Sequence, residues 1–275
     1  MTTSTTPLPV AEALATMGVA GARLDAIHAC EAGAGNISFA FKEAPGLEEV
    51  FPLAEPYTLP AEVPHLAGWT VLVTGSGQRL RDVHLDEGAC VAAVTIDEGG
   101  TTGTLRSTPR RAWAKPTSEF NSHLAVHDDQ IARRPELTQH SVVHAQPPYI
   151  VVLSHLAECR TTAAFNRRIL RWEPETIIQL PDGVGMLEFM VPGSKELMDA
   201  SVAGLREHRL VVWAKHGVLG RSDDTPLKVV DLIEYAETGA LYDHLNTVSG
   251  NRSEGLTAEE LQATLDAFGV TSTMV

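Results

Sequence analysis

The chain has 275 residues, a mean hydropathy of -0.02 and a formal net charge of -14 at pH 7. Its 44% of hydrophobic residues can fill the core of one large domain. This negative charge excludes binding of nucleic acid or of an anionic membrane through the overall electrostatic field of the protein. Any bound phosphate must therefore be held by local donors such as backbone N–H groups.

Apolar residues at helical spacing predict a helix over residues 10–28. A glycine-rich turn follows and leads into an apolar strand at residues 37–41. Residues 44–67 are rich in proline and glutamate and predict a loop excursion within the domain. Three further strands are expected, at residues 69–74, 89–96 and 103–107.

Proline near its start and Glu119 in its first turn indicate a helix from Pro116 to about residue 132. Beyond it we expect strands at residues 139–145, 176–180 and 210–214, and helices at residues 147–156, 194–208, 225–248 and 257–268. Helices and strands do not alternate strictly. The order predicts one α/β domain over residues 1–275, flexible at residues 1–9, with a mainly antiparallel central sheet flanked by helices on both faces.

The three cysteines Cys30, Cys90 and Cys159 are far apart and form no CxxC pair. This spacing favours neither a disulfide framework nor a cysteine zinc site, and it fits a reducing cytosol. The N-terminus shows no signal-peptide pattern, and the longest apolar stretch, residues 141–156, is broken by polar residues and prolines. We therefore expect a cytoplasmic protein with no membrane or nucleic-acid partner.

His144 and His216 each follow an apolar strand, where a ring nitrogen can face a cleft. A lone histidine is more often a satisfied, half-buried side chain, but two at strand exits favour a metal site. Glu119 is a third candidate, although its place also fits ordinary helix capping. His123 and His127 lie on the same helix face as Glu119. No HExxH glutamate separates them, so we expect core or supporting roles.

Two glycine-rich turns, residues 33–36 and 74–77, place several backbone N–H groups where they can converge on one anion. Plain turn chemistry is the alternative. Together with Thr117 and Ser118 at a helix start, these turns could hold one phosphate monoester. Neither turn is a Walker or GxGxxG motif, and no GxSxG elbow is present, so the motifs support neither a nucleotide nor a serine nucleophile.

The order of these motifs resembles the class II aldolase/adducin family. The series is Gly35-Asn36-Ile37-Ser38, Thr74-Gly75-Ser76-Gly77, Pro116-Thr117-Ser118-Glu119, His144 and His216-Gly217. Four stretches look most similar to the branch that cleaves L-rhamnulose 1-phosphate: residues 71–77, 181–185, 190–193 and 268–271. The likeness runs from about residue 10 to the C-terminus.

The resemblance implies a mainly antiparallel sheet flanked by helices, assembled as a cyclic homotetramer with active sites between subunits. Positions that hold the substrate phosphate in the family correspond to Asn36, Ser76, Gly77, Thr117 and Ser118. Gly33 stands where the family has an asparagine, so one phosphate donor is missing. Glu119 matches the proton-transferring glutamate. Glu175, by its own context a solvated loop carboxylate, matches a residue that reaches a neighbouring subunit's site.

His144 and His216 match two of the three zinc histidines of the family, and Gln146 replaces the third. An amide oxygen is a weaker and harder ligand than imidazole. His155 is too far along the next helix to substitute, at roughly 1.5 Å of rise per residue. Either Gln146 ligates through oxygen, or the site has two histidines, Glu119 and water. Zn²⁺ is expected, with Mn²⁺, Fe²⁺ or Co²⁺ as alternatives.

The implied reaction is reversible retro-aldol cleavage of a ketose 1-phosphate through a metal-stabilised enediolate. The expected substrate is L-rhamnulose 1-phosphate, giving dihydroxyacetone phosphate and L-lactaldehyde. Another phosphosugar aldolase, a pentulose-phosphate epimerase or a dehydratase would use the same site. A non-catalytic adducin-like protein is the alternative that the Gln146 replacement favours, and a metal hydrolase is a more remote one.

Overall fold

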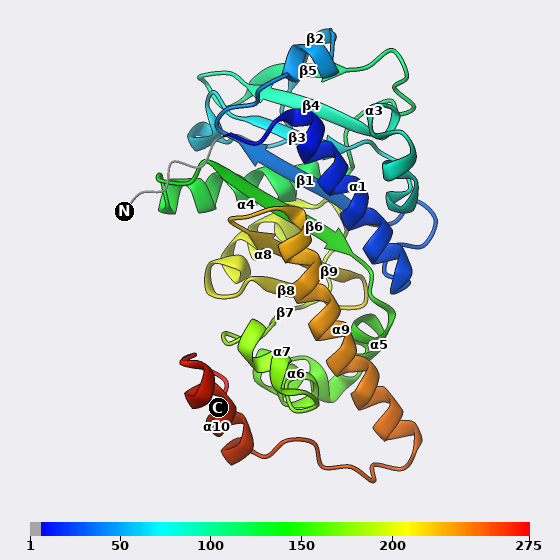
Figure 1. The fold of residues 1–275 in the computed structure, drawn as a ribbon, viewed down its shortest axis with the longest axis vertical. Helices are drawn as coiled ribbons and strands as arrows, with labels where there is room; N and C mark the ends of the chain where they lie inside the picture. Colours follow the sequence, from blue (N-terminus) through cyan, green and yellow to red (C-terminus); the bar gives the residue numbers. More distant parts are fainter. Residues whose placement is uncertain (1–6) are drawn as a thin grey trace.

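The computed structural model describes residues 7–275 and folds them around one nine-stranded sheet (Figure 1). The strand order is β2-β5-β4-β3-β1-β6-β9-β8-β7, and all neighbours are antiparallel except the parallel pair β7–β8. This confirms the predicted fold class. The strands are β1 (Asn36–Phe41), β2 (Leu53–Thr58), β3 (Thr70–Thr74), β4 (Val91–Ile96), β5 (Thr102–Ser107), β6 (Gln139–Ala145), β7 (Gly185–Leu187), β8 (Leu210–Trp213) and β9 (Gly217–Ser222).

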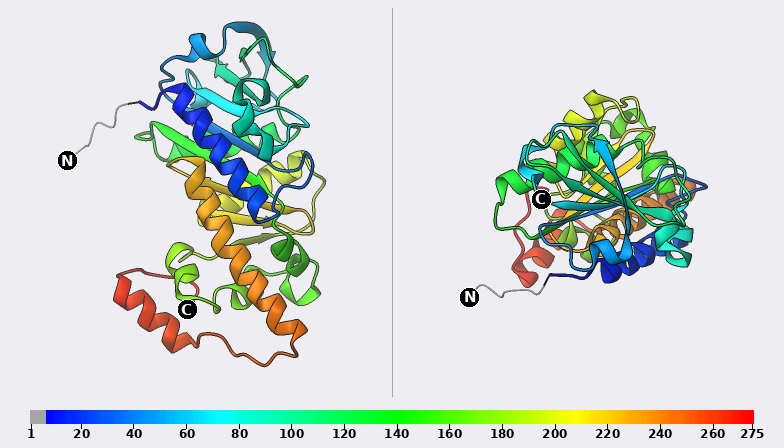
Figure 2. Two further views of the ribbon diagram at one scale, coloured as in Figure 1. Left: turned by 45° about the vertical axis from the view of Figure 1, so that its right-hand side comes forward. Right: turned by 90° about the horizontal axis from the view of Figure 1, so that it is seen from above.

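Helices cover both faces of the sheet (Figure 2). Helices α1 (Val10–Ala26) and α9 (Pro226–Val248) lie on one face, and α4 (Phe120–Arg133) and α8 (Lys195–Glu207) lie on the other. The apolar stripe predicted for the first helix is buried, because Val10, Leu14, Met17 and Leu24 are at most 4% exposed. Burying apolar stripes against both faces of the sheet supplies most of the driving force for this layered arrangement.

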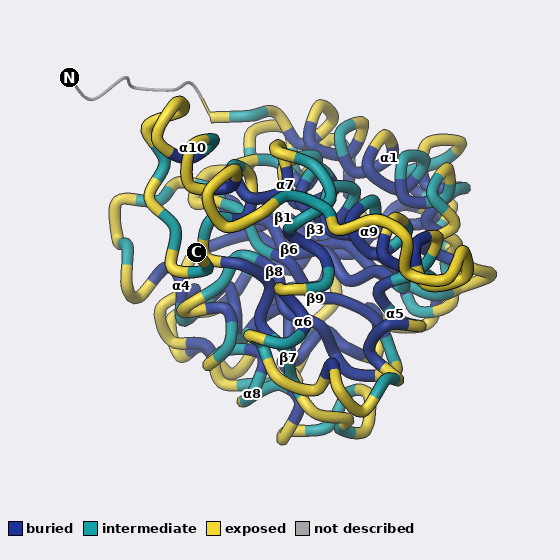
Figure 3. Tube along the Cα trace, turned by 90° about the horizontal axis from the view of Figure 1, so that it is seen from below, coloured by how far each residue is buried: buried dark blue, intermediate teal, exposed yellow. Residues whose placement is uncertain are grey.

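Shorter helices complete the structure. Helices α5 (Pro148–Ser154), α6 (Thr162–Ile169), α7 (Pro174–Gln179) and α10 (Ala258–Phe268) gather beyond β7, at the lower end of Figure 1. A capping box formed by Thr257 and Glu260 starts α10. Helices α2 (Leu47–Val50) and α3 (Glu87–Cys90) and a 3₁₀ segment (Leu80–Leu85) lie near α1. The central strands are buried while the outer loops are exposed (Figure 3).

The loop excursion expected at residues 44–67 is wrong in part, because it contains α2 and the edge strand β2. Strand β2 pairs along its whole length with β5, although almost all of its side chains are exposed. An exposed edge strand has no apolar alternation to reveal it, and Pro56 is tolerated there. Its pairing with a distant strand is therefore what forms it.

Two further boundaries differ from prediction. The strand expected at residues 176–180 is helix α7, which begins at Pro174, a residue suited to the first helical turn. The helix expected from Pro116 begins at Phe120, because Pro116 forms a β-bridge with Gly75. The flexible segment expected at residues 1–9 lies, up to residue 6, outside the described residues. Within residues 7–275, none of the helices has the length and apolar character needed to cross a bilayer.

Candidate active site

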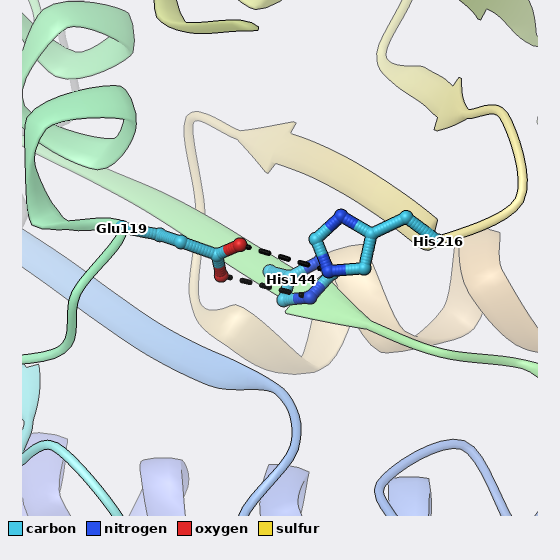
Figure 4. A group of neighbouring side chains, drawn as sticks. All are labelled: Glu119, His144 and His216. Carbon is cyan, nitrogen blue, oxygen red and sulfur yellow. Dashed lines mark ion pairs between the residues drawn. The ribbon is translucent and has the colours of Figure 1, made fainter. Parts of the chain in front are cut away.

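Glu119 occupies the position immediately before helix α4, with φ -99° and ψ 14°. Its side chain makes no capping hydrogen bond with the first turn of the helix. The carboxylate is buried and points toward two histidine rings (Figure 4). Its Oε2 lies 3.6 Å from Nε2 of His144, and its Oε1 lies 3.7 Å from Nε2 of His216. The start of α4 thus presents a carboxylate to the exits of two strands.

His144 lies near the end of β6, between β1 and β9. Its side chain is 1% exposed, and its Nδ1 donates to the carbonyl oxygen of Val218 at 2.8 Å. A hydrogen bond of this kind fixes the tautomer of a histidine ring. In the neutral ring Nε2 is then the unprotonated nitrogen, and it faces Glu119, as a metal ligand requires.

His216 lies in the tight turn that joins β8 to β9. Lys215 takes a left-handed conformation in this turn, with φ 65°, and its N–H donates to Ser154 Oγ at 2.8 Å. A side chain on Gly217 would meet the carbonyl oxygen of Ala145 at 2.3 Å. The glycine therefore lets β9 lie directly against the exit of β6, which brings the two predicted histidines together.

Trp213 supports both histidine rings, a role that sequence reasoning missed. Its ring stacks on His144 at 4.6 Å and on His216 at 5.2 Å between centroids. The indole N–H donates to Ser201 Oγ at 2.9 Å, which fixes the ring in the core. The sequence offers one indication of this role, because Trp213 ends an apolar strand and lies three residues before the candidate ligand His216.

The donor set fits a divalent metal. Burial and the nearby His144 lower the pKa of His216 to about 4, and Glu119 offsets this only partly. The ring is thus neutral at physiological pH, the state that binds metal. The donor atoms of Glu119, His144 and His216 all lie within 4.8 Å of one another. Ligands about 2.1 Å from a tetrahedral zinc ion are about 3.4 Å apart, close to the observed separations.

Gln146 follows β6 and is half-buried, with its backbone N–H donating to Ala29 at 2.7 Å. Its amide faces the carboxylate of Glu31, which only accepts hydrogen bonds, so the amide nitrogen must be on that side. In this orientation it donates to the two oxygens of Glu31 at 2.6 and 3.3 Å. Glu31 therefore holds the nitrogen end of Gln146. The role of Gln146 as a metal ligand stays a prediction.

The segments expected to hold phosphate are joined to one another. Thr117 N–H donates to the Thr74 carbonyl oxygen at 3.1 Å, and Ser76 N–H donates to that of Lys115 at 2.9 Å. The site of a Cβ on Gly33 lies 3.4 Å from the carbonyl oxygen of Gly77. Both glycine-rich turns thus meet beside the start of α4.

Exposure within this group suits a ligand that arrives from solvent. Gly77 and Ser118 are exposed and Ser76 is half-buried, whereas Thr117 is buried. Gly77 has φ 76°, a conformation that favours glycine. Phosphate binding by these residues stays a prediction.

Two predicted residues have other surroundings. Asn36 donates from Nδ2 to Oε2 of Glu119 at 2.8 Å, and its Oδ1 faces His123, so both ends of its amide are engaged beside the donor group, and phosphate binding by Asn36 stays a prediction. Glu175 is exposed in the first turn of α7 and is not part of the donor group of Glu119, His144 and His216. Its predicted action in a neighbouring subunit's site stays a prediction.

The sequence matches the model of the class II aldolase and adducin N-terminal domain over residues 16–242. The chain belongs to this family. It is 32% identical to the rhamnulose-1-phosphate aldolase of Escherichia fergusonii over 225 residues, 80% of this chain and 77% of that protein. Enzymes of the same name from several Escherichia coli strains show the same identity and coverage.

Solved structures agree with the family assignment. A sugar-phosphate aldolase from Thermotoga maritima superposes with a TM-score of 0.72 and 26% identity, covering 89% of this chain and 98% of that one. The L-fuculose-1-phosphate aldolase of Thermus thermophilus shares the fold, with a TM-score of 0.56, 19% identity and coverage of 90% and 100%. Family and donor group together make this chain a metal-dependent class II aldolase.

Proposed function

We propose that the chain cleaves L-rhamnulose 1-phosphate to dihydroxyacetone phosphate and L-lactaldehyde, and catalyses the reverse condensation. The observation that carries this proposal is the donor group of Glu119, His144 and His216 in a class II aldolase. The substrate rests on similarity to enzymes named rhamnulose-1-phosphate aldolase. Zn²⁺ is the expected metal, and Mn²⁺, Fe²⁺ or Co²⁺ would suit an additional amide-oxygen ligand at Gln146.

His144, His216 and Glu119 would hold the metal, with the oxygen of Gln146 as a further ligand. When bound, a divalent metal supplies Lewis-acid polarisation of the ketose carbonyl. The phosphate is held by Ser76, Gly77, Thr117 and Ser118 and by Asn36. Binding this remote group positions the carbon–carbon bond that breaks.

Proton transfers balance the reaction. The hydroxyl group on the aldehyde half loses its proton to a base as the carbon–carbon bond breaks, and the freed carbon of the other half gains a proton. We assign the proton on that carbon to Glu119, since its carboxylate lies within the donor group. The aldehyde-side proton is assigned to Glu175 of a neighbouring subunit in a cytoplasmic homotetramer, because Glu175 is exposed and lies outside the donor group of its own chain.

Metal content and product formation test the proposal together. We expect near-stoichiometric metal in the purified protein and formation of dihydroxyacetone phosphate that stops on chelation and returns on addition of metal. A panel of ketose 1-phosphates and ribulose 5-phosphate identifies the substrate. Metal without cleavage of L-rhamnulose 1-phosphate would move the assignment to another phosphosugar. Absence of both metal and turnover would contradict an aldolase.

The shared site has its own test. Glu119→Gln and Glu175→Gln are each expected to be inactive as pure assemblies. Mixed assemblies, made by unfolding and refolding the two variants together, should regain activity, because some sites then contain Glu119 from one chain and Glu175 from another. Refolding each variant alone is the control. Mixed assemblies without activity would place both carboxylates in one chain's site, and a fully active Glu175→Gln variant would remove Glu175 from the reaction.

A further inference from the structure

A continuous line of buried polar side chains leads away from Glu119 into the core. Asn36, Ser38, His123, His127 and His140 are all at most 5% exposed. Asn36 and Ser38 come from β1, His123 and His127 from α4, and His140 from β6. Since strands β1 and β6 are neighbours and α4 packs against β6, all of these residues lie in one layer.

Each member contacts the next at hydrogen-bond distance. Asn36 Oδ1 lies 2.5 Å from Nε2 of His123, and His123 Nδ1 lies 2.6 Å from Ser38 Oγ. Ser38 Oγ lies 2.8 Å from Nε2 of His127. His127 Nδ1 lies 2.7 Å from Nδ1 of His140, where the series ends.

The carboxylate at one end fixes the direction of every bond. An ionised Glu119 only accepts, so Asn36 must turn its amide nitrogen toward it and its oxygen toward His123. His123 must then carry its proton on Nε2. Burial lowers the pKa of His123 well below its ordinary value, so the ring is neutral and Nδ1 is bare. The hydroxyl of Ser38 consequently donates to it.

The remaining links follow in the same way. Ser38 has no second proton, so His127 donates to it from Nε2. Burial lowers the pKa of His127 to about 3, which leaves Nδ1 bare as an acceptor for Nδ1–H of His140. Burial also lowers the pKa of His140, so its Nε2 carries no proton, and this atom is buried without a partner among residues 7–275.

Every N–H or O–H bond in the series thus points toward Glu119. Packing alone does not require such a series. Apolar side chains of similar volume would fill the same space without leaving a buried polar atom unpaired, as Nε2 of His140 is left here among the described residues. Groups that orient the ligands of a metal commonly form layers behind them. We propose that His123 and Ser38 are positioning residues that hold the Asn36 amide with its nitrogen toward Glu119, and that His127 and His140 continue the series behind them. This inference rests on the role of Glu119 proposed above.

Substitutions at His123 separate positioning from packing. In glutamine the amide nitrogen is as many bonds from Cβ as Nε2 is in histidine, so His123→Gln keeps a donor for Asn36. His123→Asn reaches only the position of Nδ1, and His123→Leu only fills space. We expect His123→Leu and His123→Asn to weaken Zn²⁺ binding by about 10-fold or more, and His123→Gln to recover most of that affinity. The measurement is competition with a chromophoric chelator.

Imidazole ¹⁵N spectra give a second readout that needs neither metal nor turnover. In metal-free protein we expect N–H signals from Nε2 of His123, Nε2 of His127 and Nδ1 of His140. Ser38→Ala is a smaller change, should the His123 variants fail to fold. It interrupts the series, so His127 should show a mixture of tautomers while His123 keeps its proton on Nε2. Equal Zn²⁺ affinities of the Gln, Asn and Leu variants, or the opposite tautomers, would overturn the inference. If the wild type binds no metal, the proposed function fails and the ¹⁵N spectra alone decide this inference.

Discussion

A buried carboxyl group between helices α9 and α5 should make the stability of the protein depend on pH. Glu237 on α9 is 6% exposed and accepts the N–H groups of Tyr149 and Ile150 at 2.8 and 2.9 Å. These belong to the first turn of α5, which leaves the sheet just after Gln146. Burial raises the pKa of Glu237 from 4.5 to about 7, although the two hydrogen bonds act the other way. Glu237→Gln removes this titration.

The direction of the effect follows from proton binding. Between the unfolded pKa of 4.5 and the folded pKa of about 7, the folded protein binds more protons at Glu237 than the unfolded chain does. The free energy of unfolding therefore falls as the pH rises. The stabilisation is fully present below the unfolded pKa and is lost as the pH passes the folded pKa. At about 1.4 kcal/mol per pH unit, the loss is about 3 kcal/mol, of which about 2.5 kcal/mol falls between about pH 5 and about pH 8.

Urea unfolding at a fixed protein concentration measures this difference. We expect the wild type to lose about 2.5 kcal/mol more than Glu237→Gln between about pH 5 and about pH 8. The glutamine loses one of the two hydrogen bonds, but that cost is the same at both pH values. Glu254→Gln, the same change at an exposed position, is the control and should behave as the wild type. Equal losses in the wild type and in Glu237→Gln would refute the reasoning.

Three further predictions concern the site. Glu119→Gln keeps an acceptor for Asn36, so it should fold normally but lower turnover by about 100-fold or more; unchanged turnover would remove Glu119 from proton transfer. Gln146→His replaces an amide oxygen with imidazole, a stronger zinc ligand, and should tighten Zn²⁺ binding by about 10-fold or more. Chelator competition measures the affinity, and an unchanged value would place residue 146 away from the metal. Gly33→Asn restores the missing donor at a position where a Cβ makes only ordinary contact with Gly77. It should lower the KM for the phosphorylated ketose by about 5-fold, while a KM that stays the same would exclude this turn from phosphate binding.

Most of the fold could be predicted because its inner strands and long helices carry regular apolar patterns. Strands β1, β3 and β6 are apolar runs bounded by turn residues, and α1 and α9 begin and end close to the expected residues. Strand β2 could not be predicted, since its exposed side chains carry no pattern and its pairing with β5 depends on residues far along the chain. Strands β7 and β9 and helix α6 were missed as well. Strand β7 has three residues and pairs in parallel with β8, so local sequence hardly marks it.

The metal donors could be predicted only as candidates. His144 and His216 each had a satisfied-histidine alternative until the β6–β9 pairing placed their strand exits side by side. Glu119 fitted a helix cap in sequence. The bridge between Pro116 and Gly75 moves the start of α4 to Phe120, which leaves Glu119 at the edge of the helix with its carboxylate free to face the histidines. Tertiary contacts, rather than local propensity, thus decide its role.

The hydrogen-bonded series behind Glu119 shows what residue spacing can predict. Spacing within one helix or strand predicts which side chains share a face, but it does not predict which elements pack together. On α4 the spacing of four residues between Glu119, His123 and His127 already predicts one face. On the strands, Asn36 and Ser38 are two residues apart and His140 and His144 are four apart, so each pair also shares a face. No local pattern tells which strand pairs with which, or that Asn36 lies opposite His144 and Ala40 opposite His140. Once that register is known, the polar residues of α4, of β1 and of β6 are seen to form one buried layer. Proton positions along this layer then follow from the charge of a single carboxylate.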